Sequence, residues 1–498
     1  MSDVKKLAGQ TFVYGIPTIL GRFLNYFLVP LHTYNIGAQE YGQVSELYAY
    51  AALMQVLLTY GMETAFFRYS QDYDKKIVFN TALLSLMLST GIFLLITFSF
   101  LSPICSAMEY SGHPSYISLF LIILSLDALR AIPYDWLRRE NRAARFALVK
   151  SIDIFTNIIF NVIFIVVCPY LKKHGFEDSL SWFNENDLVV YIFISNLIAS
   201  IASFIMLIPQ FRLFRLHFDS ALLRKMLAYG FPVMIGGLAG MVNETFDRVA
   251  LRRLVRIPEN ITTIADANAY KIAQIGIYGA CYKLATLVSL FIQAFKFAAE
   301  PFFFSKMKQQ DAKKSYASVM SAFVIFLCIV FLGVTGYLDI FQYFMGRDYR
   351  QGLAVVPILL LANIFLGIYY NLSIWYKVTD KTKWGAYISI FGAIITLVGN
   401  FLLVPLISYV GAAITTLVCY FSISALCYLI GQKYYPIAYD VKRLCFYIIF
   451  ALILYSVMYI VRVQFDNVWL NIALATILIA IYAFVAYKKD IARIIKER

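Results

Sequence analysis

Long apolar runs constrain this 498-residue chain more than any other feature of its sequence. The runs are about 20 residues long, and at 1.5 Å rise per residue a helix of that length crosses the ~30 Å hydrocarbon core of a bilayer. Hydrophobic residues make up 61% of the chain, against ~45–50% in soluble domains. A membrane interior admits only helices or a closed barrel, and runs this long exclude the ~10-residue strands of a barrel. The sequence therefore predicts an all-α polytopic membrane protein.

We expect fourteen membrane helices and no separate soluble domain. The first helix follows Lys5 and Lys6 and is too long for the core of a cleaved signal peptide, so we expect it to be permanent. The predicted spans are 12–34, 44–67, 77–101, 116–137, 146–170, 188–208, 227–251, 272–297, 316–337, 352–376, 384–408, 411–430, 444–460 and 468–487.

Lysine and arginine are divided unevenly between the loops that connect these spans. If the N-terminus lies inside, the inner loops hold 29 of them, the outer loops hold nine, and five lie within helices. Cytoplasmic loops of membrane proteins carry such an excess, so we expect both termini in the cytoplasm. Because the net charge of +14 is spread over many short loops, it reflects topology and not a nucleic-acid partner.

An internal repeat divides most of the chain into two related halves. The segment YGIP at 14–17 returns as YGFP at 229–232. Glu63 lies 22 residues after Tyr41, and Glu300 lies 22 residues after Tyr278. Two related apolar halves are typical of secondary transporters, which bind substrate where the halves meet.

Each repeat spans six predicted helices, an even number, so both halves enter the membrane from the same side. We expect them to be related by a pseudo-two-fold axis along the membrane normal. The predicted division is an N-lobe with helices 1–6 at 1–213, a C-lobe with helices 7–12 at 214–436, and helices 13 and 14 with a cytoplasmic tail at 437–498.

Five basic residues fall within predicted spans and are the candidate substrate-binding residues: Arg22, Lys283, Arg130, Arg248 and Lys296. A charge at mid-bilayer costs at least ~2.5–3.5 kcal/mol on insertion scales, so each needs a partner or a wet cavity. For the last three, an acid lies three or four residues away on the same helix, and a local ion pair is the alternative interpretation. These acids are Asp127, Glu244 and Glu300.

Arg22 and Lys283 have no acid at those spacings, and both are predicted near the membrane midplane. One interpretation is a salt bridge between helices, for instance to Glu46, Glu63 or Asp153. The other is an anion site in a central cavity shared by the halves. A phosphate or pyrophosphate suits Arg and Lys by charge and by hydrogen bonding.

Four further residues are predicted to shape the transport path and not to bind substrate. Glu63 and Glu300 lie near inner helix ends, each followed by aromatic residues, and we expect them to close the inner face of each half. Pro17 and Pro232 can loosen the backbone ladder where a helix must bend.

Enzyme and metal motifs are weak, so we expect no catalytic activity, no metal and no cofactor. The four histidines are scattered, and there is no GxxxxGK[ST] phosphate-binding sequence. The DYD segment at 72–74 is explained by a solvated inner loop. No pair of cysteines has metal-ligand spacing, and we interpret them as small core residues: Cys105, Cys168, Cys281, Cys328, Cys419, Cys427 and Cys445.

The segments GIYGACYKLATLVSLFIQAFKFAAEPFFF at 276–304 and YGFPVMIGGLAGMVNETFDRVAL at 229–251, with fourteen helices and a six-plus-six repeat, resemble Wzx-type polysaccharide flippases. These belong to the multidrug/oligosaccharidyl-lipid/polysaccharide exporter superfamily. The resemblance implies a V-shaped pair of six-helix lobes that works by alternating access in a bacterial inner membrane. The implied cargo is an undecaprenyl-pyrophosphate-linked oligosaccharide, moved outward for surface polysaccharide such as the O-antigen of lipopolysaccharide. H⁺ or Na⁺ is the candidate coupling ion.

The related lipid II flippases use cavity arginines, and a groove along their last two helices holds the lipid tail. Arg22 matches one such basic position approximately, and Lys283 matches another in helix and charge. Three alternatives stay open: a lipid II flippase, a cation-coupled multidrug exporter, and a membrane polysaccharide polymerase or ligase. The exporter needs an acidic cavity, whereas the intramembrane charges without an acid on their own helix are basic. A large outer loop rich in Arg and His would favour the polymerase or ligase, whereas the outer loops here are short.

Overall fold

A computed structural model describes residues 23–24, 26–215, 218–307, 309–379, 381–465 and 467–491, with no side chains at 297, 298, 300, 301, 304, 305, 490 and 491. All regular structure in these ranges is helical, as predicted. The longer helices up to residue 254 are α2 (Leu28–Asn35), α3 (Ala38–Thr59), α4 (Met62–Tyr69), α5 (Lys75–Ser99), α6 (Leu101–Ala107), α7 (Pro114–Arg139), α8 (Ala143–Val162), α9 (Cys168–Lys173), α10 (Leu188–Met206), α11 (Ile208–Phe211) and α12 (Ser220–Leu254). The longer helices that follow are α13 (Ile264–Lys306), α14 (Ala312–Gly336), α15 (Leu338–Phe341), α16 (Val355–Leu372), α17 (Ile374–Val378), α18 (Lys383–Tyr434), α19 (Val441–Gln464) and α20 (Val468–Ala486).

Eleven helical stretches within the described ranges are long and apolar enough to cross a membrane. The 52-residue α18 contains two predicted spans, 384–408 and 411–430, which meet at a kink where Ile407 and Ser408 leave helical geometry. Pro405 lies just before the kink, and proline removes a ladder hydrogen bond. The predicted span 12–34 lies mostly outside the described residues, so the count of fourteen stays a prediction.

The predicted span 44–67 is wrong as a single helix. It is broken into α3 and α4 at Tyr60 and Gly61, which both adopt left-handed backbone conformations, with φ of 34° and 74°. Glycine reaches this region without steric cost. The break also admits another helix, because a Cβ on Gly61 would lie 2.2 Å from the carbonyl oxygen of Gly230 in α12.

The described chain forms two compact units. The first extends to Arg252 and includes 268–276, and the second comprises 253–267 and everything from Ile277 onward. Most of α12 therefore packs with the first unit, although the repeat assigns it to the second half. Because the division at 213 and 436 comes from the repeat and not from contacts, it stays a prediction.

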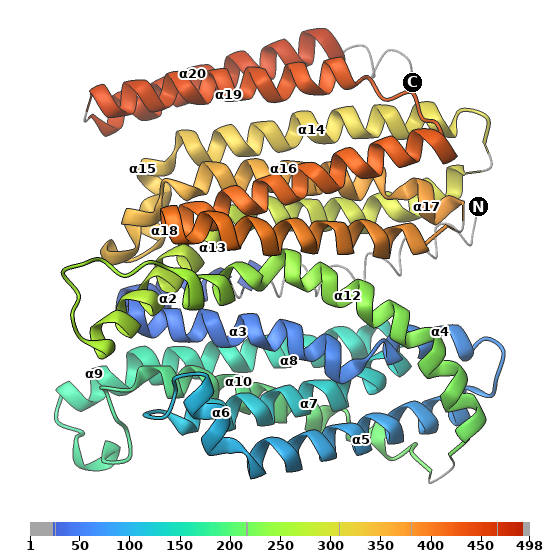
Figure 1. The fold of residues 1–498 in the computed structure, drawn as a ribbon, viewed down its shortest axis with the longest axis vertical. Coiled ribbons are helices and arrows are strands. Elements are labelled where there is room, and N and C mark those ends of the chain that lie inside the picture. Colours follow the sequence, from blue (N-terminus) through green and yellow to red (C-terminus); the bar gives the residue numbers. More distant parts are fainter. Residues whose placement is uncertain are drawn as a thin grey trace. The chain divides into compact units, whose positions relative to one another are not determined.

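Within the first unit, α7 lies at the centre and contacts α3, α5, α8 and α10. Figure 1 shows these helices running side by side, with α12 crossing α3 obliquely near α4. The end of this unit near α4 is an apolar core in which Leu222 and Met226 of α12 pack among Phe66, Phe79 and Trp136. The N-terminal end of α12 is thus fixed to α4, α5 and α7 by burial of apolar surface.

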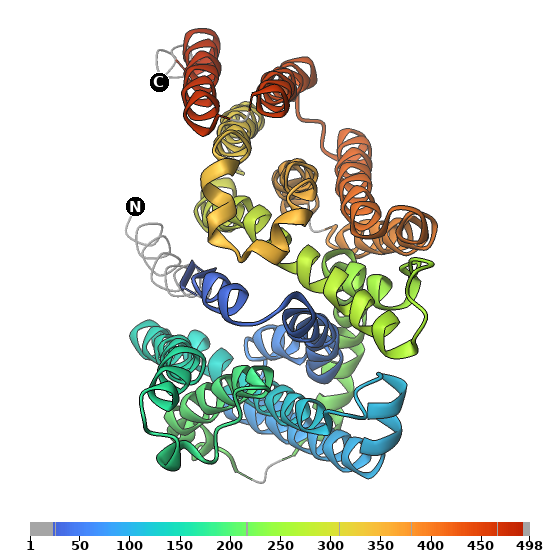
Figure 2. The same ribbon diagram turned by 90° about the vertical axis from the view of Figure 1, so that its left-hand side faces the viewer.

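Within the second unit, α16 packs against α14 and α18, and α19 and α20 pack on α14. In Figure 2 the helices are seen nearly end-on, and the red α19 and α20 adjoin the yellow α14. One polar anchor joins α19 and α20 to α15, because Asp339 of α15 accepts hydrogen bonds from Arg462 at 3.3 Å and from Asn471 at 3.1 Å. Arg462 of α19 also donates to the carbonyl oxygens of Thr335 and Gly336 at the end of α14, at 3.1 and 3.0 Å.

Two glycines in the first unit allow α3 and the start of α13 to touch backbone to backbone. A Cβ on Gly42 would lie 2.0 Å from the carbonyl oxygen of Ile272, and one on Gly276 would lie 1.9 Å from that of Ala38. We expect Gly42→Ala to destabilise the protein by about 1–3 kcal/mol, because backbone atoms must move to relieve the clash. Thermal unfolding in detergent measures this effect.

Gly91→Ala is the matched control, because a Cβ at Gly91 in α5 meets nothing within 4 Å. Alanine is favoured over glycine inside a helix by up to ~1 kcal/mol, so the control is expected to be neutral or slightly stabilising. Equal stability of the Gly42 and Gly91 variants would contradict the close approach of α3 and α13.

Candidate functional site

Six of the nine residues assigned from the sequence have described side chains. Arg22 and Pro17 lie outside the described residues, as does the side chain of Glu300. The predicted nearness of Glu63 and Glu300 after superposition of the halves therefore stays a prediction. Pro232 lies inside α12, two residues after Gly230, at the point where α12 meets the break between α3 and α4.

Lys283 is exposed in the middle of α13. Its neighbours Tyr282 and Leu284 are buried, so its side chain leaves the packed side of the helix. The apolar part of α13 extends over Ile264–Lys296, which puts Lys283 within a few residues of its centre. An ammonium at this depth cannot face hydrocarbon without a large cost. The geometry thus favours a wet environment at Lys283.

Lys296 and Arg248 have protein partners. The Lys296 ammonium lies 5.0 Å from the centroid of the Tyr370 ring, within cation–π range. Arg248 donates hydrogen bonds to the Asp247 carboxylate at 2.8 Å and to the Glu244 carbonyl oxygen at 2.7 Å. The carboxylate that contacts Arg248 is thus that of Asp247, which helix spacing did not single out, whereas Glu244 contributes its backbone carbonyl oxygen.

Arg130 is buried in a network that joins α7, α8 and α10. Its guanidinium contacts the Asp127 carboxylate, which confirms the predicted local pair, and lies 2.9 Å from the Asp153 carboxylate on α8. It also donates to the hydroxyls of Ser200, at 3.2 Å, and Ser203 on α10. Arg130 is 6% exposed, so two carboxylates and two hydroxyls offset the cost of burying its charge.

These contacts belong to a longer set of polar side chains in the first unit, which we call the polar stripe. On each of three helices its members are three or four residues apart, a spacing that places their side chains on one face of the helix. Its members are Asp127, Arg130 and Tyr134 on α7, Lys150, Asp153 and Asn157 on α8, Asn196, Ser200 and Ser203 on α10, and Tyr48 on α3.

Two further contacts join members of the stripe. The Lys150 ammonium lies 4.2 Å from the centroid of the Tyr134 ring. Asn196 donates a hydrogen bond of 2.9 Å to the Tyr48 hydroxyl. Arg130, Asp127 and Asp153 were expected from sequence as ion-pair candidates, and the signal for the other members is the matching periodicity of polar residues in three neighbouring spans.

A second charged cluster was missed because the predicted span 227–251 ended one residue early. Arg252 lies inside α12, with its guanidinium 3.6 Å from the Glu46 carboxylate and 2.8 Å from that of Glu109. Tyr110 donates a hydrogen bond of 2.8 Å to Glu46. Glu46, considered from sequence as a partner for Arg22 or Lys283, thus binds Arg252. The available signal was membrane depth, because the prediction puts Glu46 and Arg252 at the same depth, each at the outer end of its span.

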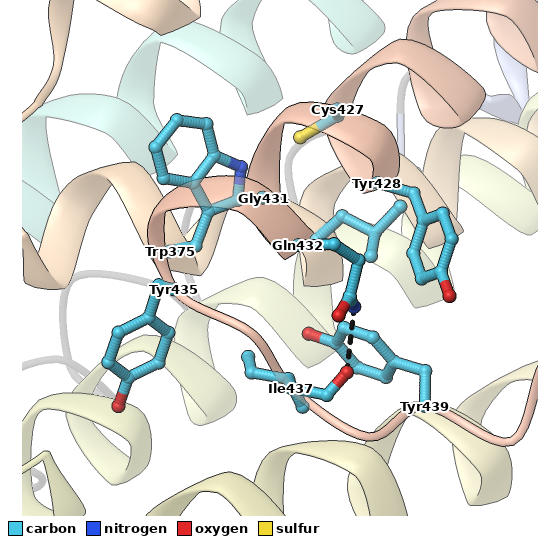
Figure 3. A pocket seen from close by; sticks show the side chains of 9 residues that line it. Trp375, Cys427, Tyr428, Gly431, Gln432, Tyr435, Ile437 and Tyr439 are labelled. Atoms are coloured by element: carbon cyan, nitrogen blue, oxygen red, sulfur yellow. Dashed lines mark hydrogen bonds between the residues drawn. The ribbon is translucent and has the colours of Figure 1, made fainter.

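A small cavity lies in the second unit where α18 ends (Figure 3). The space in it that a water-sized sphere can occupy is about 10 Å³, which is room for about one water molecule. Gln432 donates a hydrogen bond of 2.7 Å to the Ile437 carbonyl oxygen beside it, and burial raises the pKa of the neighbouring Tyr439. The cavity is too small for a glycan, and its lining is mainly apolar: Leu372, Trp375, Cys427, Tyr428, Gly431, Gln432, Tyr435, Ile437 and Tyr439.

The family model described as polysaccharide biosynthesis protein matches residues 7–307. This chain belongs to that family. The matched segment includes all five basic residues that the sequence assigns to substrate binding. No curated protein matches the chain.

Solved structures with the same fold are transporters. The lipid II flippase MurJ in an inward closed conformation aligns with a TM-score of 0.72 at 16% identity, over 96% of this chain and 99% of that one. The Vibrio cholerae MATE transporter VcmN in its bent form gives 0.55 at 13% identity, over 87% and 98%. An inward-facing multidrug resistance MATE transporter of the MOP superfamily gives 0.51 at 14%, over 87% and 94%. These likenesses confirm the predicted fold class, and at such identities they carry the fold alone.

Proposed function

We propose that this protein is a flippase that moves polyprenyl-pyrophosphate-linked oligosaccharides from the inner to the outer leaflet of a bacterial inner membrane. The observation that carries the proposal is the exposed Lys283 at the centre of a membrane helix. The family supports a glycan cargo. A polyprenyl pyrophosphate carrier joins such a glycan to a pyrophosphate anion. An ammonium in a wet cavity attracts an anion of this kind.

Lys283 would bind the pyrophosphate directly. A charge-assisted hydrogen bond from an ammonium to a phosphate oxygen is roughly twice as strong as a neutral one. We propose Arg22 as a second ligand on the basis of its predicted depth. Arg130, Arg248 and Lys296 contact Asp153, Asp247 and Tyr370, respectively. We therefore propose that they attract the pyrophosphate through their electrostatic field and do not contact it directly. Alternating access, coupling to H⁺ or Na⁺ and cytoplasmic termini belong to the same proposal.

A lipid II flippase is the second candidate. It is supported by the alignment with a lipid II flippase structure, which covers 96% of this chain. A multidrug exporter is less well supported. Such an exporter needs acids to attract cationic drugs, and the acids Asp127 and Asp153 within the membrane both contact Arg130.

A flipping assay in liposomes tests the proposal. The probes are undecaprenyl-pyrophosphate-linked oligosaccharide and lipid II, each with a fluorophore on the sugar, and fluorescent phosphatidylcholine is the control. A membrane-impermeant quencher reports which leaflet holds the probe. We expect the protein to accelerate flipping of the oligosaccharide probe at least about tenfold, a barrier change of roughly 1.4 kcal/mol, without effect on phosphatidylcholine. Acceleration of lipid II alone would select the second candidate, and no acceleration of either would overturn both.

A further inference from the structure

We infer that the polar stripe of the first unit, through Tyr48, Asp127, Asp153 and Asn196, binds the glycan part of the substrate. This inference rests on the proposed function, because it assigns the sugar of the lipid-linked cargo to a surface separate from Lys283.

The centre of the stripe is accessible at mid-membrane depth. Asp127 lies 13 residues into the 26-residue α7, about 20 Å from either end. Its side chain is 37% exposed and that of Asp153 is 25% exposed, whereas Leu124 and Ala128 beside Asp127 are buried. A carboxylate at this depth faces water or protein and not lipid. The stripe therefore borders a wet space.

The charges along the stripe balance. Asp127 and Asp153 both contact Arg130. Lys150 lies three residues before Asp153, on the same face of α8. Two acids and two bases leave no net charge, so the surface favours neither an anion nor a cation. Its remaining capacity is for neutral polar groups, which is the chemistry of sugar hydroxyls.

The stripe supplies donors and acceptors in alternation. An ionised carboxylate has about four acceptor sites, and Asp127 accepts here from Arg130 and from Ser200. Tyr48 is 40% exposed, and its hydroxyl accepts from the Asn196 amide, which leaves the hydroxyl proton to donate. From Asn196 to Ser203 the α10 part of the stripe extends about 10 Å, comparable to the length of a disaccharide.

Tyr48→Phe and Asn196→Ala are the test variants, because they remove exposed polar groups without breaking the Arg130 network. The two probes are an N-acetylglucosamine disaccharide on a polyprenyl pyrophosphate and the same polyprenyl pyrophosphate without sugar. Binding is measured on the full-length protein in nanodiscs by native mass spectrometry. Each variant is expected to bind the sugar-bearing probe roughly twofold to tenfold more weakly, the range for one hydrogen bond, and to bind the sugar-free probe like the parent protein.

Three further variants keep the result interpretable. Ser125→Ala is the matched control, because this α7 hydroxyl bonds only to the Leu121 carbonyl oxygen of its own helix among the described contacts, and we expect no change with either probe. Asp127→Asn should repeat the selective loss if the fold survives. Lys283→Ala should weaken both probes, because it removes the proposed pyrophosphate ligand.

The possible outcomes separate the inference from the proposed function. Unchanged binding of the sugar-bearing probe in Tyr48→Phe and Asn196→Ala, or an equal loss with both probes, overturns the glycan site whatever Lys283→Ala does. A stripe variant that shifts only the pH or Na⁺ dependence of flipping, with sugar binding intact, also overturns it and assigns the stripe to ion coupling. A selective loss in the stripe variants combined with no effect of Lys283→Ala supports the glycan site and overturns the proposed anion site.

Discussion

Cells in which Lys283 is replaced by alanine are expected to lose surface polysaccharide while keeping the protein in the membrane. The substitution removes the exposed ammonium at the centre of α13. Loss of a charge-assisted contact to pyrophosphate costs on the order of 1.5–3 kcal/mol, which is at least a tenfold loss of binding. Arg22→Ala is expected to act in the same direction. Surface glycan is measured by gel electrophoresis of extracted polysaccharide, alongside the abundance of each variant in membranes.

Two control variants sharpen this test. Lys283→Arg keeps the charge, so it should retain part of the activity, and a complete loss would show that a compact ammonium is needed. Lys306→Ala removes a lysine near the end of α13 that pairs with Asp311 at 3.5 Å, and it should leave glycan levels normal. Wild-type glycan in both the Lys283→Ala and Arg22→Ala cells would show that these cations do not bind substrate.

Arg252→Ala is expected to cause the largest loss of stability, about 3–5 kcal/mol, which is the usual cost of breaking a buried ion pair by removing one partner. Both Arg252 and Glu46 are about 1% exposed in their side chains, so the variant leaves a carboxylate buried without its cation. The cluster also joins α12 to α3 and to Glu109. Thermal unfolding in detergent and the amount of folded protein in membranes measure the effect.

Compensating substitutions separate charge from packing in this cluster. Arg252→Met combined with Glu46→Gln removes both charges, and the amide oxygen at position 46 can still accept from Tyr110. We expect this pair to recover most of the stability. Arg224→Ala is the matched single control, since Arg224 is exposed on the same helix and surface substitutions usually cost under ~0.5 kcal/mol. A stable Arg252→Ala protein would contradict the buried cluster.

Helix positions were largely predictable from sequence because the bilayer itself sets the length of an apolar run. The predicted spans 77–101 and 188–208 correspond to α5 and α10 within a few residues. The break between α3 and α4 was not predictable in this way. It depends on Gly61 meeting Gly230 of a distant helix, and an apolar run carries no information about which helix will cross it.

The sequence by itself determined the all-helical membrane fold and the presence of charges within the membrane, because hydropathy and spacing are local properties of a chain. Only the tertiary structure decided how those charges are used. Arg130 binds Asp153 from the next span, whereas Arg252 reaches Glu46 across some two hundred residues of chain. The Lys283 side chain is exposed, while Tyr282 and Leu284 beside it on α13 are buried. A charge in a membrane must find a partner or water, and which of the two it finds depends on helices that are remote in sequence and adjacent in space.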